Sequence, residues 1–129
     1  MRVHGPAAGV YDRSLAAIYI FMTATSPQME ALHARYARSL ASKHAALLDA
    51  WRAFAAAKDE ASARELHGLI HRLAGSAPTY GYASLGTLAR TADHAFAHGG
   101  HDLAERLEAP IEALLDDLAR QAQRAGAGH

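Results

Sequence analysis

Cysteine is absent from this chain of 129 residues, which excludes a disulfide framework, a thiolate zinc site and a cysteine nucleophile. Neither sign of charge is in excess, because Lys plus Arg and Asp plus Glu each number 13. A balanced chain gives no electrostatic reason to bind nucleic acid or an anionic membrane, so neither is expected as a partner. Half of the residues are hydrophobic, which is the composition of a globular domain.

Long hydrophobic runs are also missing. The longest run, LAAIYIFM at residues 15–22, is far shorter than the roughly 20 residues that span a bilayer. Arg2 before the run and small residues after it are features of a signal peptide, but the charged residues Asp12 and Arg13 lie just before the run. We therefore expect a cytoplasmic protein in which residues 1–25 form a leader or an additional N-terminal helix. Met22 is an alternative start.

Strand patterns are absent as well. Val, Ile and Thr are scarce, Ala is the commonest residue, and no stretch alternates polar with apolar residues. Helix-start and helix-stop signals divide residues 26–123 instead. They predict helices over residues 27–57 (with a break near 39–42), 60–77, 82–97 and 103–123, joined by the loops 58–59, 78–81 and 98–102.

Short loops between long amphipathic helices favour antiparallel neighbours, so the predicted fold is all-α, an up-down four-helix bundle. Asp59 and Asp102 are expected to cap the helices that follow them. Pro110 is expected to bend or divide the last helix near Ala109. Residues 124–129, RAGAGH, are expected to form a flexible tail.

Nine histidines are many for this length, and the helix over residues 60–77 carries two of them on an informative pattern. At 100° per residue its apolar side chains share one face. This inward face consists of Leu66, Leu69, Ile70, Leu73 and Ala77. His71 points outward beside Gly68 and Gly75, and His67 lies one turn earlier and to the side. Each helical glycine costs about 1 kcal/mol relative to Ala. We interpret the two glycines as room for another protein surface beside an exposed imidazole.

The segment H-x-L-A-G-S-A at residues 71–77, followed by Gly81 and Leu85, resembles the signature of histidine-containing phosphotransfer (HPt) domains. These are small four-helix modules of bacterial phosphorelays. The resemblance implies that His71 is the phospho-acceptor and that Gly75 gives a docking receiver domain room. It also implies a docking surface formed by His67, Gly68, Arg72, Ala74 and Gly75. Ala74 stands where the family usually has Lys, and a protonated His67 would supply part of the missing positive charge.

The resemblance implies a simple mechanism. A neutral imidazole is a competent nucleophile near pH 7 without an activating base. His71 would attack the aspartyl phosphate on the receiver domain of a hybrid histidine kinase, then pass the phosphoryl group to the receiver domain of a response regulator. The partner would supply Mg²⁺. The chain itself would need no cofactor and no ATP site, would act as a covalent intermediate rather than an enzyme, and would be a monomer.

Two other functions stay open. A metal-binding bundle is suggested by the i, i+4 pair of His67 and His71 and by a second group, His94, His98 and His101. No HExxH pattern is present, and zinc needs three or four convergent ligands, so no metal site is expected. Alternatively, the lysine missing at Ala74 marks a degenerate helical module that docks a receiver domain without phosphotransfer.

Overall fold

The computed structural model describes residues 26–127, with side chains through Gly126, and these residues contain helices and turns but no strand. The expected leader and the last two residues lie outside this range. The described residues fall into two units, one that ends at Ala34 and one, the 35–129 unit, that begins at Arg35. The helices are α2 (Pro27–Arg38), α3 (Leu40–Ala57), α4 (Glu60–Ser76), α5 (Ala83–His98) and α6 (Leu103–Ala127), with a short 3₁₀ helix, η1 (Pro78–Tyr80).

Most helix boundaries follow the sequence signals. Ser26 Oγ accepts a hydrogen bond from the backbone N–H of Met29 at 3.1 Å, and Asp59 Oδ1 accepts one from that of Ser62 at 2.9 Å. The expected break in the first long helix falls at Ser39, between α2 and α3. Gly81 has φ of 91° and closes η1, which is a left-handed conformation that glycine adopts without strain. The Asp102 carboxylate accepts a hydrogen bond from Arg106 Nε.

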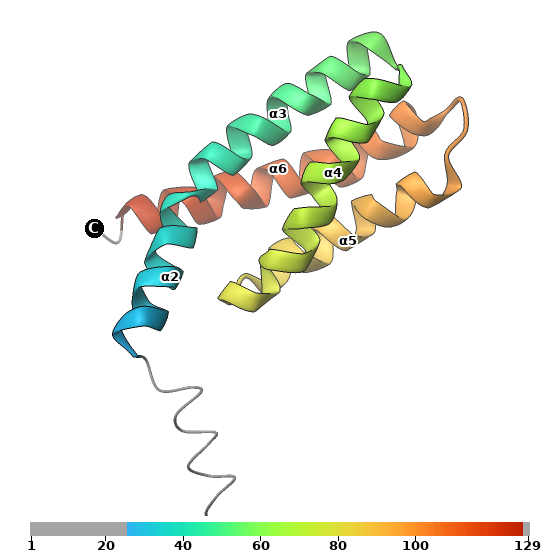
Figure 1. Ribbon diagram of the computed structural model, residues 1–129. Helices are drawn as coiled ribbons and strands as arrows, with labels where there is room; N and C mark the ends of the chain where they lie inside the picture. Colours follow the sequence, from blue (N-terminus) through green and yellow to red (C-terminus); the bar gives the residue numbers. More distant parts are fainter. Residues whose placement is uncertain (1–25, 128–129) are drawn as a thin grey trace, which may run out of the picture. The chain divides into compact units, whose positions relative to one another are not determined.

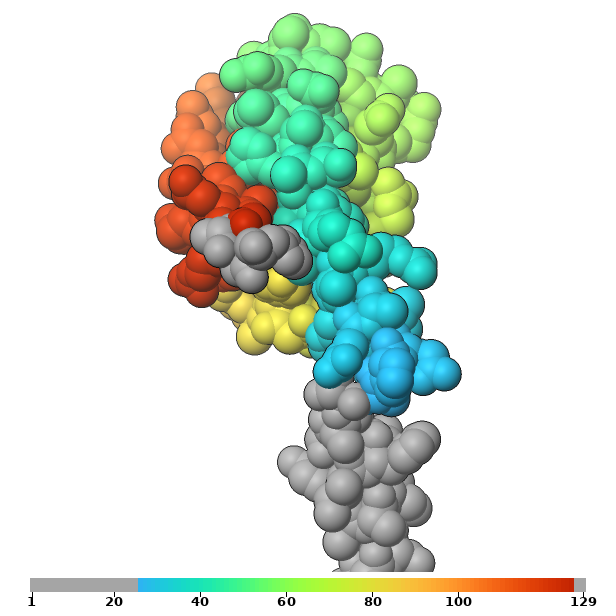
Figure 2. Space-filling view, turned by 90° about the vertical axis from the view of Figure 1, so that its left-hand side faces the viewer, coloured from blue at the N-terminus to red at the C-terminus, as the bar shows by residue number. Residues whose placement is uncertain are grey.

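The predicted all-α, antiparallel four-helix bundle is confirmed (Figure 1). Its four helices form a closed ring, in which α3 packs on α4 and α6, and α5 packs on the same two helices. A view turned by 90° shows α3 between α6 and α4 (Figure 2). Burial of apolar surface at roughly 25 cal/mol per Å² drives this packing.

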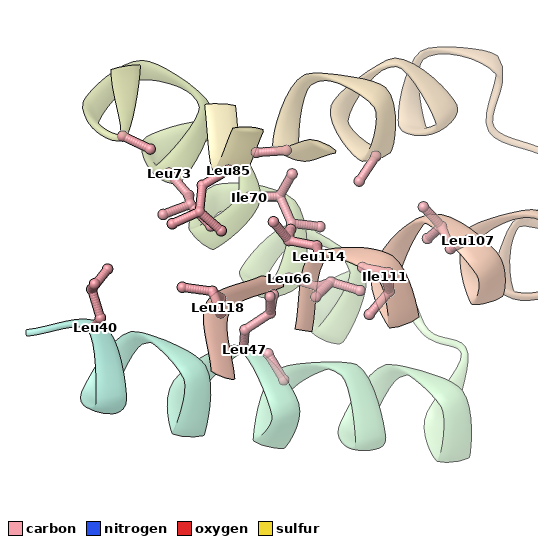
Figure 3. Close-up of a cluster of buried hydrophobic side chains, with 14 of the residues drawn as sticks. Leu40, Leu47, Leu66, Ile70, Leu73, Leu85, Leu107, Ile111, Leu114 and Leu118 are labelled. Atoms are coloured by element: carbon pink, nitrogen blue, oxygen red, sulfur yellow. The ribbon is translucent and has the colours of Figure 1, made fainter. Parts of the chain in front are cut away.

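The core lies between these four helices and consists mainly of leucine side chains that point toward one another (Figure 3). The largest fully buried side chains are Leu40, Leu66, Ile70, Leu85, Leu107, Ile111, Leu114 and Leu118. Leu66, Ile70 and Leu73 of α4 point into this core, as the helical wheel predicts. The opposite side of α4 is therefore left free to carry polar and small residues.

The last helix differs from the expectation at two points. Pro110 was expected to bend or divide this helix. α6 runs through Pro110 as one element, so the division is wrong, and the bend stays a prediction. Leu107 and Ile111 are fully buried on either side of Pro110, and this packing offsets the lost backbone hydrogen bond. α6 also continues to Ala127 through part of the expected tail, consistent with the high helix propensity of alanine. Among the described residues, no helix is long and apolar enough to cross a membrane.

Candidate functional site

His71 lies on the outer side of α4, as the sequence predicts. Its side chain is 74% exposed, whereas the preceding residue, Ile70, is fully buried. The amphipathic character of α4 produces this contrast, because buried leucine and isoleucine fix the rotation of the helix about its axis. The imidazole is therefore accessible to a second protein.

Asp93 on α5 connects the two histidines of α4. Its Oδ1 lies 2.6 Å from Nε2 of His67, and its Oδ2 lies 3.3 Å from Nδ1 of His71. The two helices are neighbours in the bundle, which brings Asp93 next to residues 22 and 26 positions earlier in the chain. We refer to these three side chains as the His–Asp–His cluster. The sequence alone does not point to Asp93, since no local pattern marks it as facing α4.

Asp93 is held as a carboxylate. Its partial burial acts to raise its pKa, but the hydrogen bonds from His67 and His71 outweigh that effect and hold the pKa below its ordinary value. An ionised carboxylate only accepts hydrogen bonds, so each facing ring nitrogen donates. His67 then carries its proton on Nε2 and His71 on Nδ1. A neutral His71 in this tautomer presents an unprotonated Nε2, which has the lone pair that a nucleophile needs.

The ring of His67 has contacts on several sides. It stacks on Phe96 of α5, with centroids 4.5 Å apart and ring planes 12° apart. Its edge-on contact with His71 has a centroid separation of 6.3 Å and an interplanar angle of 76°. Together with the hydrogen bond to Asp93, these contacts hold the ring in place. The His67 side chain is 46% exposed. His67 is therefore a half-buried member of the cluster as well as an edge of the expected docking surface.

The glycines of α4 differ in their surroundings. A Cβ added to Gly75 would meet nothing within 4 Å, whereas one added to Gly68 would come to 3.4 Å from Nη1 of Arg72. Gly75 is exposed and Gly68 is half-buried. Nothing in the part of the chain that the structure describes requires glycine at Gly75. Ala74, the position at which lysine is usual in the resembled family, is half-buried against the core.

Ser76 has a structural partner that the sequence did not reveal. Its Oγ shares a hydrogen bond of 2.8 Å with the hydroxyl of Tyr36, whose ring stacks on Tyr80 at a centroid distance of 4.4 Å. The Nζ of Lys43 lies 4.7 Å from the centroid of the Tyr36 ring and donates to Ser39 Oγ. Burial raises the pKa of Tyr36 and lowers the pKa of Lys43. Ser76 therefore ties the end of α4 to the start of the 35–129 unit.

A cavity of about 310 Å³ opens between α3 and α4. Its lining is mostly apolar and hydroxyl-bearing, with two cationic side chains, Lys43 and Arg72, and no carboxylate. The lining residues are Ser39, Ser42, Lys43, Ala46, Leu47, Leu69, Arg72, Leu73 and Ser76. Arg72, expected on the docking surface, thus lies on the α3 side of α4, while His71 contacts α5.

The second histidine group does not converge. His94 and His98 are one turn apart on α5, where Nδ1 of His98 donates to the backbone carbonyl of His94, and His101 lies in the following loop. Within residues 26–127, no group of three or more His, Cys, Asp or Glu side chains is arranged to hold a metal ion.

The chain was also compared with other proteins. No protein-family model, curated protein or solved structure matches it.

Proposed function

We propose that this chain is a phosphorelay module, in which His71 accepts a phosphoryl group from the aspartate of one receiver domain and passes it to another. The observation that carries the proposal is the pairing of an exposed imidazole with a carboxylate on its inner nitrogen. Nδ1 of His71 faces Asp93 at 3.3 Å, and the ring is 74% exposed. The outer nitrogen, Nε2, is the one left to react. The HPt-like segment at residues 71–77 supports the same role.

The chemistry needs little from this chain. The Nε2 lone pair attacks phosphorus, the Nε2–P bond forms, and the P–O bond of the partner's aspartyl phosphate breaks. The electron pair of that bond leaves on the partner's carboxylate. The ring becomes positively charged while Nδ1 keeps its proton, and Asp93 faces that charge at hydrogen-bond distance. Return transfer reverses these steps, and the receiver domain supplies the Mg²⁺ that neutralises the phosphoryl oxygens.

Docking is supported by features on the outer side of α4. A Cβ at Gly75 would meet nothing within 4 Å, so a partner surface has room to approach α4 one turn from His71. The cavity between α3 and α4 is lined by apolar side chains together with Lys43 and Arg72, which fits a partner with an apolar side chain next to carboxylates. On this basis we propose acidic receiver domains as partners. We also propose that the module is monomeric and cytoplasmic and has no cofactor of its own.

A receiver-binding module without phosphotransfer is the second candidate, favoured by one observation. Ala74 supplies no charge. Lys43 and Arg72 line the cavity between α3 and α4, whereas the cluster lies between α4 and α5. If phospho-His71 needs a cation that the partner does not provide, docking would occur without transfer.

The test is transfer from purified receiver domains that carry a radiolabelled phosphoryl group. We expect acid-labile label on the wild-type chain, none on His71→Gln, and full labelling of His94→Gln, a matched substitution of an exposed histidine on α5. Binding of a receiver without labelling would replace the relay role with the docking role. Labelling of His71→Gln equal to that of the wild type would overturn the assignment of His71.

A further inference from the structure

The two hydrogen bonds to Asp93 differ in length. The bond from His67 is 2.6 Å and the one from His71 is 3.3 Å, so His67 holds the carboxylate more closely than the proposed nucleophile does. Asp93 uses a different oxygen for each histidine, so both bonds form at once. The position of Oδ2, which faces His71, is then set by the contact of Oδ1 with His67.

His67 is itself fixed by packing. Stacking on Phe96 at 4.5 Å restricts the plane of the ring, and this leaves Nε2 directed at Asp93. Both Phe96 and Asp93 belong to α5, three residues apart and therefore on the same side of that helix. The ring of His67 thus fits between a flat apolar surface and an anionic acceptor.

We propose that His67 is a positioning residue, which anchors Asp93 so that its second oxygen holds the Nδ1–H tautomer of His71 and leaves Nε2 free to react. The effect of His67 on phosphotransfer rests on the proposed function, whereas its effect on the tautomer of His71 does not. The order of contacts is Phe96, His67, Asp93 and His71. His67 does not touch the phosphoryl group in this scheme and acts only through the carboxylate.

The physical reason lies in the geometry of a carboxylate on a helix. The side chain of Asp93 rotates about two bonds, and a bond to His71 alone, at 3.3 Å, restrains that rotation weakly. A second, shorter bond to a ring that is already held by stacking removes most of this freedom before any partner arrives. Preorganisation of this kind favours the reactive arrangement, because the cost of ordering is met during folding.

Two substitutions separate the parts of this scheme. His67→Phe keeps a flat ring to stack on Phe96 and removes the donor to Asp93, whereas His67→Gln keeps an amide donor. His94→Phe is the matched control, because it places the same new side chain on an exposed position of α5. Circular dichroism first establishes that each variant is folded.

The first readout is the tautomer of His71, measured from the ¹⁵N shifts of its ring nitrogens at pH 8.5, where imidazoles are ordinarily neutral. We expect the Nδ1–H form in the wild type and in His94→Phe, a shift toward the Nε2–H form in His67→Phe, and recovery in His67→Gln. The second readout is the rate of transfer from a labelled receiver domain. We expect the transfer rate to fall about tenfold in His67→Phe, which is the lower end of the loss seen when a hydrogen-bond partner of a functional histidine is removed. In His67→Gln, which keeps a donor, we expect the rate to fall less than about threefold.

The outcomes distinguish the two proposals. If His67→Phe leaves the tautomer of His71 as in the wild type while Asp93→Asn changes it, Asp93 needs no anchor and the inference is overturned. If the tautomer shifts as expected but no receiver domain labels the wild type, the positioning role stands and the relay function fails. If His67→Phe and His67→Gln lose transfer equally with unchanged tautomers, His67 contacts the partner and is not a positioning residue.

Discussion

The two sides of α4 differ in chemistry although the same helix supplies both. On the α5 side, one carboxylate bridges two imidazoles at 2.6 and 3.3 Å. On the α3 side, a cavity of about 310 Å³ has two cations at its lining and no carboxylate. The first arrangement sets which ring nitrogen of His71 carries the proton, whereas the second presents apolar surface and positive charge to a binding partner. The difference suggests that reactivity and partner binding are separable by substitution in this chain.

Removal of the charge at Asp93 tests this separation most strongly. Asp93→Asn leaves an amide that no longer enforces the Nδ1–H tautomer of His71, and it removes the negative charge that faces the phosphorylated ring. We expect the transfer rate to fall by about 10- to 100-fold. This is less than the roughly 10⁴-fold loss of the comparable change in a serine protease, because no proton leaves the nucleophile here. Rapid-quench kinetics with a labelled receiver domain measures the rate.

Receiver affinity is the control for that substitution. It should stay within about twofold of the wild type, since Asp93 is not on the α3 side. A loss of affinity as large as the loss of rate would mean that the two sides of α4 do not act separately.

Two helical glycines provide the next test. Gly75→Ala places a methyl group in open space, so we expect the free energy of unfolding to rise by up to about 1 kcal/mol while receiver affinity falls about tenfold. Gly86→Ala is the opposite case, because its Cβ would overlap Cγ of Pro78. It should destabilise the fold by about 1–3 kcal/mol. Urea denaturation and isothermal titration calorimetry measure the two effects. If Gly75→Ala stabilises the fold and leaves affinity unchanged, no partner approaches at that position.

The cations of the α3 side should affect binding and not chemistry. Substitution of Arg72 by Ala, or of Lys43 by Met to keep its apolar stem, should weaken receiver binding about three- to tenfold, with a smaller effect at high salt. The transfer rate at saturating receiver should change less than twofold. Glu65→Gln, an exposed position on α4 outside this cavity, is the control. A reduced rate at saturation for Arg72→Ala would place a catalytic charge on the α3 side.

Local sequence signals predicted most of the fold but only part of the site. Helix boundaries depend on neighbours in the chain, so Ser26 and Asp59 identified two of them correctly. The outward direction of His71 follows from the periodicity of α4 alone. Asp93 was missed because its role depends on which helix packs against α4 and at what register. The difference between the two sides of α4 therefore depends on how the bundle is packed, and the periodicity of a single helix cannot predict it.

The smallest expected effect is the contribution of the Asp93 carboxylate, on the α5 side of α4, to the free energy of unfolding at low pH. Because the folded protein lowers the pKa of Asp93, its ionised form stabilises the fold at every pH above the ordinary value near 3.9. That contribution disappears as the pH falls through the lower value of the folded state. The difference in unfolding free energy between the wild type and Asp93→Asn should therefore shrink from pH 5 toward pH 2. We expect a change below about 1 kcal/mol, as for other partly exposed ion pairs. Urea titrations across this range measure it, with Asp116→Asn as the exposed control. A difference that stays constant with pH would mean that the two imidazoles do not stabilise the carboxylate, and the contrast between the two sides of α4 would then rest on the cavity alone.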